Sequence, residues 1–313
     1  MKTAALIFSV AADAAILYLF LRLALSKSLT AAIAEGYLLL SGYRKRFSKR
    51  KSFEGYYALK MKENAEPFAL PDKFRPRAPL TRAGDDNMPV CVFNKDNNGT
   101  VILYLHGGAY VNRPQKMHWK FLDRLALKTG AQIHVPLYPL LPQGDGPRAF
   151  SAVSEYYRSL SPEKHPVVLM GDSAGAGLAA AIAAAEASKP EKLILISPWV
   201  DVSMQNPDLA DYDRDPLCAL YGLRRLGEMW AKDCGTQDPR VSPVNGCPES
   251  LENVAVFAGA RELLYPDIVR FCNKIPNVRM IVQRGVHHDY PLYPTPEARK
   301  AARQIRKLLK SDR

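Results

Sequence analysis

The stretch that decides the fold of this chain is Val167-Val-Leu-Met170, followed directly by Gly171-Asp-Ser-Ala-Gly175. The apolar run predicts a buried strand, and the alanine-rich sequence at 174–187 predicts a helix immediately after it. A Gly-x-Ser-x-Gly sequence between a strand and a helix makes a sharp turn that presents the serine at the edge of a sheet. Ser173 is therefore the candidate nucleophile, and the N–H groups at the helix start lie beside it.

On both sides of this turn, short apolar runs alternate with helical patterns. Strands are predicted at 101–105, 132–135, 167–170, 193–196, 254–257 and 279–282, and helices at 117–129, 148–160 and 174–187. This alternation predicts an α/β fold with a mostly parallel central sheet covered by helices on both faces. Asn98-Gly99 also predicts a hairpin turn between apolar runs at 90–93 and 101–105, although Asn98-Gly-Thr100 would equally fit a glycosylation site.

The alternation stops between Pro198 and Gly246, where Asp and Pro are frequent. An insertion there would lie above the carboxyl edge of the sheet, where open α/β folds bind ligands. It would form a lid together with the N-terminal helices. The expected division is an N-terminal helical segment at 1–78, a catalytic core at 79–200 and 247–313, and a cap insertion at 201–246.

A second motif, His106-Gly-Gly-Ala-Tyr110, follows the predicted strand at 101–105. A Gly-Gly pair in this place lets backbone N–H groups turn toward a bound oxygen, as in the oxyanion loops of α/β-hydrolases. The predicted oxyanion hole consists of the N–H groups of Gly107, Gly108 and Ala174. His106 is expected to brace the loop, because the chain order of this fold places the catalytic histidine last.

Together these motifs resemble the hormone-sensitive-lipase-like group of α/β-hydrolase carboxylesterases. The likeness extends from about Val101 to Leu309 and includes Tyr138-Pro-Leu-Leu-Pro142, Ser197-Pro-Trp-Val-Asp201 and Asp238-Pro-Arg-Val-Ser-Pro243. It implies an α/β-hydrolase fold with a helical cap. It also implies hydrolysis of short- to medium-chain carboxylic esters through an acyl-enzyme on Ser173, with no metal or cofactor.

The resemblance also indicates the partners of Ser173. The stretch after the predicted strand at 254–257 offers two carboxylates. The family pattern places the catalytic acid at Glu262, with Asp267 as the alternative, and glutamate is accepted in this role. Of the adjacent His287 and His288, the family pattern favours His288 as the base, and neighbouring positions in an extended loop point to opposite sides. Asp172, beside the nucleophile, is expected to link its turn to the neighbouring loop.

Two other functions use the same fold. An amidase or arylformamidase would employ the same triad, and a non-catalytic small-molecule binder would typically lack one of its members. The five cysteines are scattered without a Cys-x-x-Cys pair, which opposes a zinc site and a disulfide scaffold and favours a reducing, cytoplasmic location. His118, His134 and His165 show no metal-ligand spacing.

The net charge of +12 concentrates at 43–51 and in the C-terminal 299–313, the latter as the solvated face of a closing helix. No nucleic-acid recognition motif accompanies it. Residues 3–21 are nearly all apolar and allow three interpretations. A membrane anchor would bury Asp13 at a cost of about 3 kcal/mol, a signal peptide would have a short apolar core, and an amphipathic helix would align Ser9, Asp13 and Lys27. Basic residues at 44–51 suit anionic lipid headgroups, so membrane-surface contact through 1–51 is a hypothesis.

Overall fold

The computed structural model describes residues 13, 16, 19, 26–84 and 88–310 of the 313-residue chain. Eight strands in this part form one sheet in the order β1-β2-β4-β3-β5-β6-β7-β8. Their bounds are β1 Leu80–Gly84, β2 Pro89–Phe93, β3 Val101–Leu105, β4 Gln132–Pro136, β5 Val167–Asp172, β6 Lys192–Ile196, β7 Val254–Gly259 and β8 Arg279–Gln283. Pairing is antiparallel for β1–β2 and β2–β4 and parallel between all other neighbours, so the predicted mostly parallel sheet is confirmed.

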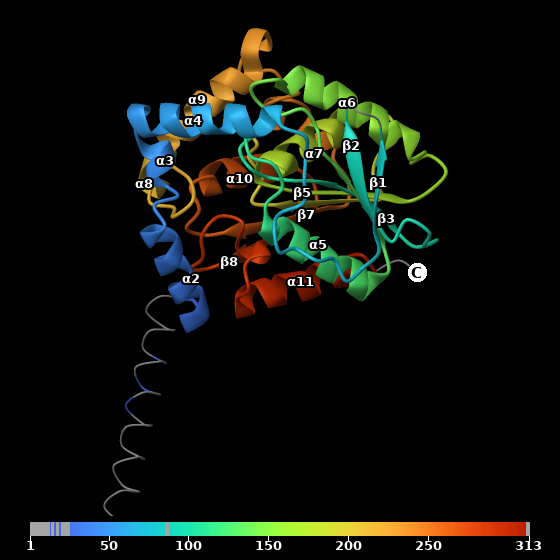
Figure 1. Ribbon diagram of the computed structural model, residues 1–313, viewed down its shortest axis with the longest axis horizontal. Coiled ribbons are helices and arrows are strands. Elements are labelled where there is room, and N and C mark those ends of the chain that lie inside the picture. Colours follow the sequence, from blue (N-terminus) through green and yellow to red (C-terminus); the bar gives the residue numbers. More distant parts are fainter. Residues whose placement is uncertain (1–12, 14–15, 17–18, 20–25, 85–87, 311–313) are drawn as a thin grey trace, which may run out of the picture.

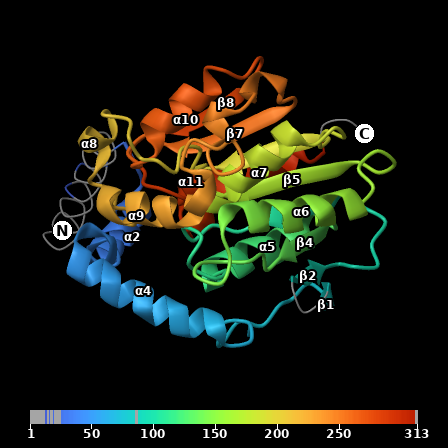
Figure 2. The same ribbon diagram turned by 90° about the horizontal axis from the view of Figure 1, so that it is seen from above.

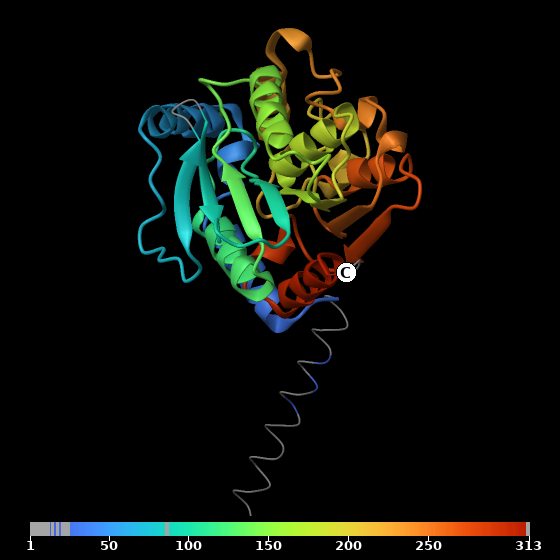
Figure 3. The ribbon, with the colours of Figure 1, turned by 90° about the vertical axis from the view of Figure 1, so that its right-hand side faces the viewer.

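Helices cover both faces of this sheet (Figure 1, Figure 3). The α-helices are α2 Leu29–Leu40, α3 Lys45–Ser48, α4 Arg50–Ala65, α5 Lys116–Thr129, α6 Gly146–Ser159, α7 Ser173–Ala185, α8 Leu209–Tyr212, α9 Leu220–Ala231, α10 Tyr265–Cys272 and α11 Pro296–Leu308. Alternate side chains of one strand enter two different cores. Leu103 and Leu105 pack with α6, α7 and α10, whereas Ile102 and Tyr104 pack with α5 and α11. Burial on both faces explains why the strands are continuous apolar runs.

The hairpin predicted at Asn98-Gly99 is wrong. Strand β2 pairs with β1 and β4, and β3 pairs with β4 and β5, so the strands that flank this turn are not neighbours. The chain crosses over through α5 and returns as β4, which lies between them. A central place in the sheet buries both faces of β3, and this outweighs a local turn signal.

The N-terminal helices and the 201–246 segment pack against each other at one end of the sheet (Figure 2). Arg44 lies 3.0 Å from the Asp213 carboxylate, and the rings of Phe53 and Tyr221 meet edge-on with centroids 6.0 Å apart. A methyl group at Gly222 would lie 2.6 Å from Phe47, so α9 and α3 pack without space for a larger side chain. The two segments expected to form a lid are therefore in contact, while the division at 78, 200 and 246 stays a prediction.

The three interpretations of residues 3–21 fall almost entirely outside the described residues. Within the described ranges, no helix is both long enough and apolar enough to cross a membrane. The closing helix is confirmed as α11, which buries Ala301 and Ile305 and is followed by the buried Leu309.

Candidate active site

Ser173 stands where β5 passes directly into α7, as the motif predicts. Its φ of +50° lies in the left-handed region, which a residue with a side chain adopts at a cost of about 1–3 kcal/mol. The turn is tight enough that a methyl group on Gly175 would lie 2.1 Å from the carbonyl oxygen of Leu105. Glycine is therefore required there, and the strained turn points Ser173 into a cavity.

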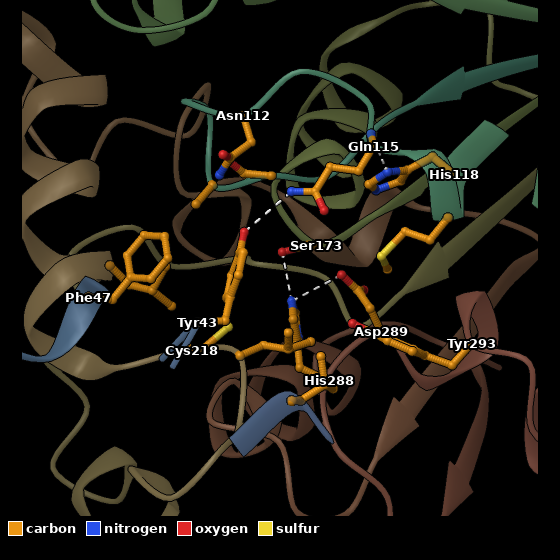
Figure 4. Close-up of a pocket in the computed structure, with 16 residues that line it drawn as sticks. Tyr43, Phe47, Asn112, Gln115, His118, Ser173, Cys218, His288, Asp289 and Tyr293 are labelled. Atoms are coloured by element: carbon orange, nitrogen blue, oxygen red, sulfur yellow. Dashed lines mark hydrogen bonds and ion pairs between the residues drawn. The ribbon is translucent and has the colours of Figure 1, made fainter. Parts of the chain in front are cut away.

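Three of the predicted residues form a continuous hydrogen-bonded chain. Nε2 of His288 lies 2.8 Å from Oγ of Ser173 (Figure 4), and its Nδ1 lies 2.7 Å from Oε2 of Glu262. The other oxygen of Glu262 accepts a hydrogen bond of 2.8 Å from the N–H of Gly259. The carboxylate thus keeps the Nδ1 proton in place, so Nε2 can accept a proton from the serine.

The two alternative residues lie elsewhere. Asp267 accepts a hydrogen bond of 2.8 Å from Asn206, and burial raises its pKa to about 6. None of its hydrogen bonds within the described part of the chain involves His288. His287 donates from Nδ1 to the carbonyl of His288 at 2.7 Å, and its ring packs edge-on against Tyr293. Geometry therefore favours Glu262 over Asp267 and His288 over His287.

A second carboxylate, which the sequence interpretation missed, touches the histidine. Oδ2 of Asp289 lies 3.3 Å from Nε2 of His288, on the side that faces Ser173 (Figure 4). Asp289 has φ +54°, and its N–H donates to Oγ of Ser197 at 3.0 Å. Burial alone would lower the pKa of His288, but Asp289, Cys218 and Glu262 together outweigh burial and raise that pKa well above 6.5.

The oxyanion loop differs from the prediction by one residue. The N–H of Gly107 donates to Oδ1 of Asp172 at 2.9 Å, so this donor is already used and does not fit an oxyanion role. The next two residues, Gly108 and Ala109, line the cavity with Ser173. In the part of the chain that the structure describes, their N–H groups donate to no protein acceptor. Residue types alone could not reveal this shift, because it depends on Asp172 reaching across from β5.

Asp172 links the nucleophile turn to the oxyanion loop, as expected. Besides Gly107 it accepts hydrogen bonds from the Tyr104 hydroxyl and from Nε2 of His118, the latter at 3.1 Å. Burial would raise the pKa of Asp172, but His118 and the other donors lower it below its usual value. Nδ1 of His118 accepts from the N–H of Gln115, so the ring carries its proton on Nε2 and donates it to the carboxylate. No local sequence pattern indicates this role of His118.

His106 braces the same loop without reaching Ser173. Its Nδ1 donates to the carbonyl of Gly107 at 2.8 Å, and its ring stacks on Tyr138 with centroids 4.6 Å apart. Burial lowers the pKa of His106 to about 4, so the ring is neutral at pH 7.

The 201–246 segment holds the histidine loop through Asp215. Oδ2 of this buried carboxylate accepts the N–H of His288 at 3.0 Å, and Oδ1 accepts the N–H of Leu217 at 2.8 Å. The segment contains many aspartates, and the sequence offers no signal that singles out Asp215. Its role depends on a contact between positions far apart in the chain.

The cavity in front of Ser173 has a volume of about 180 Å³ and a mostly apolar lining. The N-terminal helices and the chain around them supply Leu38, Tyr43 and Phe47, and the inserted segment supplies Leu217 and Leu223. No cluster of His, Cys, Asp and Glu suited to a metal ion occurs among the described residues. The site therefore brings a serine, a histidine, a carboxylate and two amide N–H donors together around a small apolar space.

A family model described as the alpha/beta hydrolase fold matches residues 102–292. This protein belongs to the alpha/beta hydrolase family. The hydrolase is 29% identical over 221 residues to an esterase of Acinetobacter venetianus, a match that covers 66% of this chain and 73% of that one. It is 31% identical over 180 residues to an acetyl-hydrolase of Streptomyces hygroscopicus. That match covers 54% of this chain and 60% of the relative, so it spans less than two thirds of the relative's length.

Solved structures agree with this assignment. A putative esterase from Staphylococcus aureus superposes on the hydrolase with a TM-score of 0.79 at 29% identity, covering 87% of this chain and 96% of that one. A hormone-sensitive lipase from a metagenome library shares the fold, with a TM-score of 0.71 at 22% identity over 82% of this chain and 92% of that one. The resemblance to hormone-sensitive-lipase-like α/β-hydrolases is thus confirmed.

Proposed function

We propose that this hydrolase cleaves carboxylic esters through an acyl-enzyme on Ser173. The observation that carries the proposal is the chain from Ser173 through His288 to Glu262, with contacts of 2.8 and 2.7 Å at the wall of an apolar cavity. Such a constellation is recognised by geometry and is characteristic of acyl transfer. The relatives named esterase and acetyl-hydrolase support an ester as the substrate.

The mechanism follows from the direction of the hydrogen bonds. Nε2 of His288 takes the proton of Ser173 while Oγ attacks the acyl carbon, and the Glu262 carboxylate stabilises the resulting imidazolium. As the tetrahedral intermediate collapses, the bond to the alcohol oxygen breaks and His288 returns the proton to that oxygen. Water then repeats the sequence on the acyl-enzyme, which releases the acid and restores Ser173.

The oxyanion is assigned to the N–H groups of Gly108, Ala109 and Ala174, with Ala109 in place of Gly107. Ala174 is the second residue of α7, and the N–H groups of the first helical turn have no partner within the helix. Each such donor typically lowers the barrier by about 3 kcal/mol. Asp172 and His106 hold the loop in place and take no direct part.

We further propose that α2–α4 and the 201–246 segment act as a cap that limits the acyl chain. The cavity of about 180 Å³ is smaller than the roughly 300–1,000 Å³ of pockets for drug-sized ligands, which supports short acyl groups. We expect turnover of p-nitrophenyl acetate and butyrate to exceed that of the laurate, and butyryl p-nitroanilide to be cleaved much more slowly. Faster cleavage of the anilide would instead identify an amidase, and no turnover of either class would favour a non-catalytic binder.

The pH dependence of kcat/KM should show the effect of Asp289 on the pKa of His288. His288 acts as a base only when neutral, and Asp289 raises its pKa, so kcat/KM should fall as the pH drops through a midpoint above 6.5. Asp289→Asn removes the largest of the contributions that raise the pKa of His288 and should move the midpoint to lower pH. The measurement is kcat/KM for p-nitrophenyl butyrate against pH, with Asp208→Asn, an exposed aspartate, as the control. A midpoint that stays in place or rises in Asp289→Asn would contradict the assignment.

A further inference from the structure

Helix α2 presents an apolar stripe to solvent, unlike an ordinary surface helix. Its exposed stripe consists of Leu29, Ile33, Tyr37 and Leu40, with exposed fractions of 46%, 63%, 72% and 90%. These positions recur at intervals of three and four residues and therefore share one face. A helix on the surface of a soluble domain normally turns such a stripe toward the core. An exposed contiguous apolar stripe of this kind marks an interaction surface.

The opposite face of α2 is held in place by charge. Glu35 is 8% exposed and forms ion pairs with the buried Lys27 and with Arg261, which lies next to the catalytic-site residue Glu262. At its start, the N–H and hydroxyl of Ser28 donate to Glu297 of α11. Because a buried charge is costly to leave unpaired, these contacts fix the rotation of α2 and keep the apolar stripe outward.

A basic segment follows the stripe directly in the chain. Lys45, Arg46, Lys49, Arg50 and Lys51 are all exposed. They are concentrated on α3 and the start of α4, which follow α2 in the chain and lie on the same side of the molecule as α2 (Figure 1). A second copy of the chain, related by a two-fold axis, would bring two such positive clusters together and be repelled. Anionic lipid headgroups match the cluster, while the acyl region matches the stripe.

We propose that the α2 stripe (Leu29, Ile33, Tyr37 and Leu40) and the basic segment at 45–51 dock this hydrolase onto the surface of an anionic lipid bilayer. Leu38, on the same helix, lines the catalytic cavity together with Tyr43, so docking places the cavity close to the lipid surface. The docking surface is independent of catalysis, and the inactive Ser173→Ala protein should bind vesicles equally well.

The test is co-sedimentation of the full chain with phosphatidylcholine vesicles and with vesicles that also contain phosphatidylglycerol. Ile33→Ser with Leu40→Ser should weaken partitioning by about tenfold or more, because two exposed apolar side chains no longer enter the acyl region. Leu127→Ser, which removes a 46% exposed leucine from α5, is the control and should bind like the unmodified protein. Lys49→Gln with Lys51→Gln should weaken binding about fivefold or more, and only to the anionic vesicles.

Unchanged activity on water-soluble p-nitrophenyl butyrate would show that each of the surface variants is folded. If the Ile33→Ser/Leu40→Ser protein bound vesicles as well as the unmodified protein, the proposal would be overturned, and binding would have to come from residues 1–25. Failure of the unmodified chain to sediment with either vesicle would also overturn it. A dimer that this double substitution converts to a monomer, seen by size-exclusion chromatography, would identify a second copy as the occupant instead.

Discussion

Replacing Ser173 with alanine should lower kcat for p-nitrophenyl butyrate by a factor of about 10⁴ to 10⁶. The reason is that Oγ of this serine forms the bond to the acyl group, and without the hydroxyl His288 has no serine proton to accept in the proposed mechanism. The residual rate of the variant comes from substrate binding and the oxyanion donors, with water as a poor nucleophile in place of the serine. The loss should appear in kcat, with KM changing little, because the hydroxyl contributes mainly to the transition state.

The matched control is Ser154→Ala on α6. Ser154 is buried at 2% exposure, and its hydroxyl has no hydrogen-bond partner among the described residues. Its removal should leave kcat unchanged and preserve the free energy of unfolding, measured by urea denaturation. If Ser173→Ala retained more than a tenth of the original kcat while Ser154→Ala behaved as expected, another nucleophile would have to be sought.

Replacing Glu262 with glutamine should lower kcat by about 10⁴-fold. A glutamine presents a neutral amide to Nδ1 of His288, which no longer stabilises the imidazolium. Where the NH₂ group of the glutamine faces the ring, it donates to Nδ1 and the ring proton moves to Nε2. Nε2 can then no longer accept the proton of Ser173. The substitution preserves size, and the amide oxygen can still accept the N–H of Gly259, so the effect should appear in kcat at nearly constant stability.

Asp267→Asn is the paired comparison, because this carboxylate was the alternative acid in the sequence. Asp267 contacts Asn206 and lies 3.9 Å from Arg270, away from the histidine. Activity should change by less than about twofold, while the free energy of unfolding falls by roughly 1 kcal/mol if the exchange disturbs the buried bond to Asn206. A larger loss of kcat in Asp267→Asn than in Glu262→Gln would reverse the assignment.

Ser173 and its turn could be predicted because every requirement is local. A buried strand, two glycines and a small-residue helix follow one another without interruption, and φ +50° at Ser173 is a property of that short stretch. The parallel sheet was predictable for a related reason, since each strand buried on both faces leaves a continuous apolar run. The hairpin at Asn98-Gly99 failed because strand order is a property of the whole sheet, in which β4 displaces the sequence neighbour of β3.

The sequence by itself determined the chemistry that this protein can perform: a serine at a strained strand-to-helix turn, a glycine loop upstream, and a histidine and carboxylates downstream. Tertiary structure alone decided which atoms meet. Gly107 loses its N–H to Asp172, Asp289 reaches His288, Asp215 anchors the histidine loop, and α2 turns its apolar side outward. Each of these outcomes depends on burial and hydrogen bonding between residues far apart in the chain. Such contacts leave no local pattern, because they exist only after the strands and helices have packed.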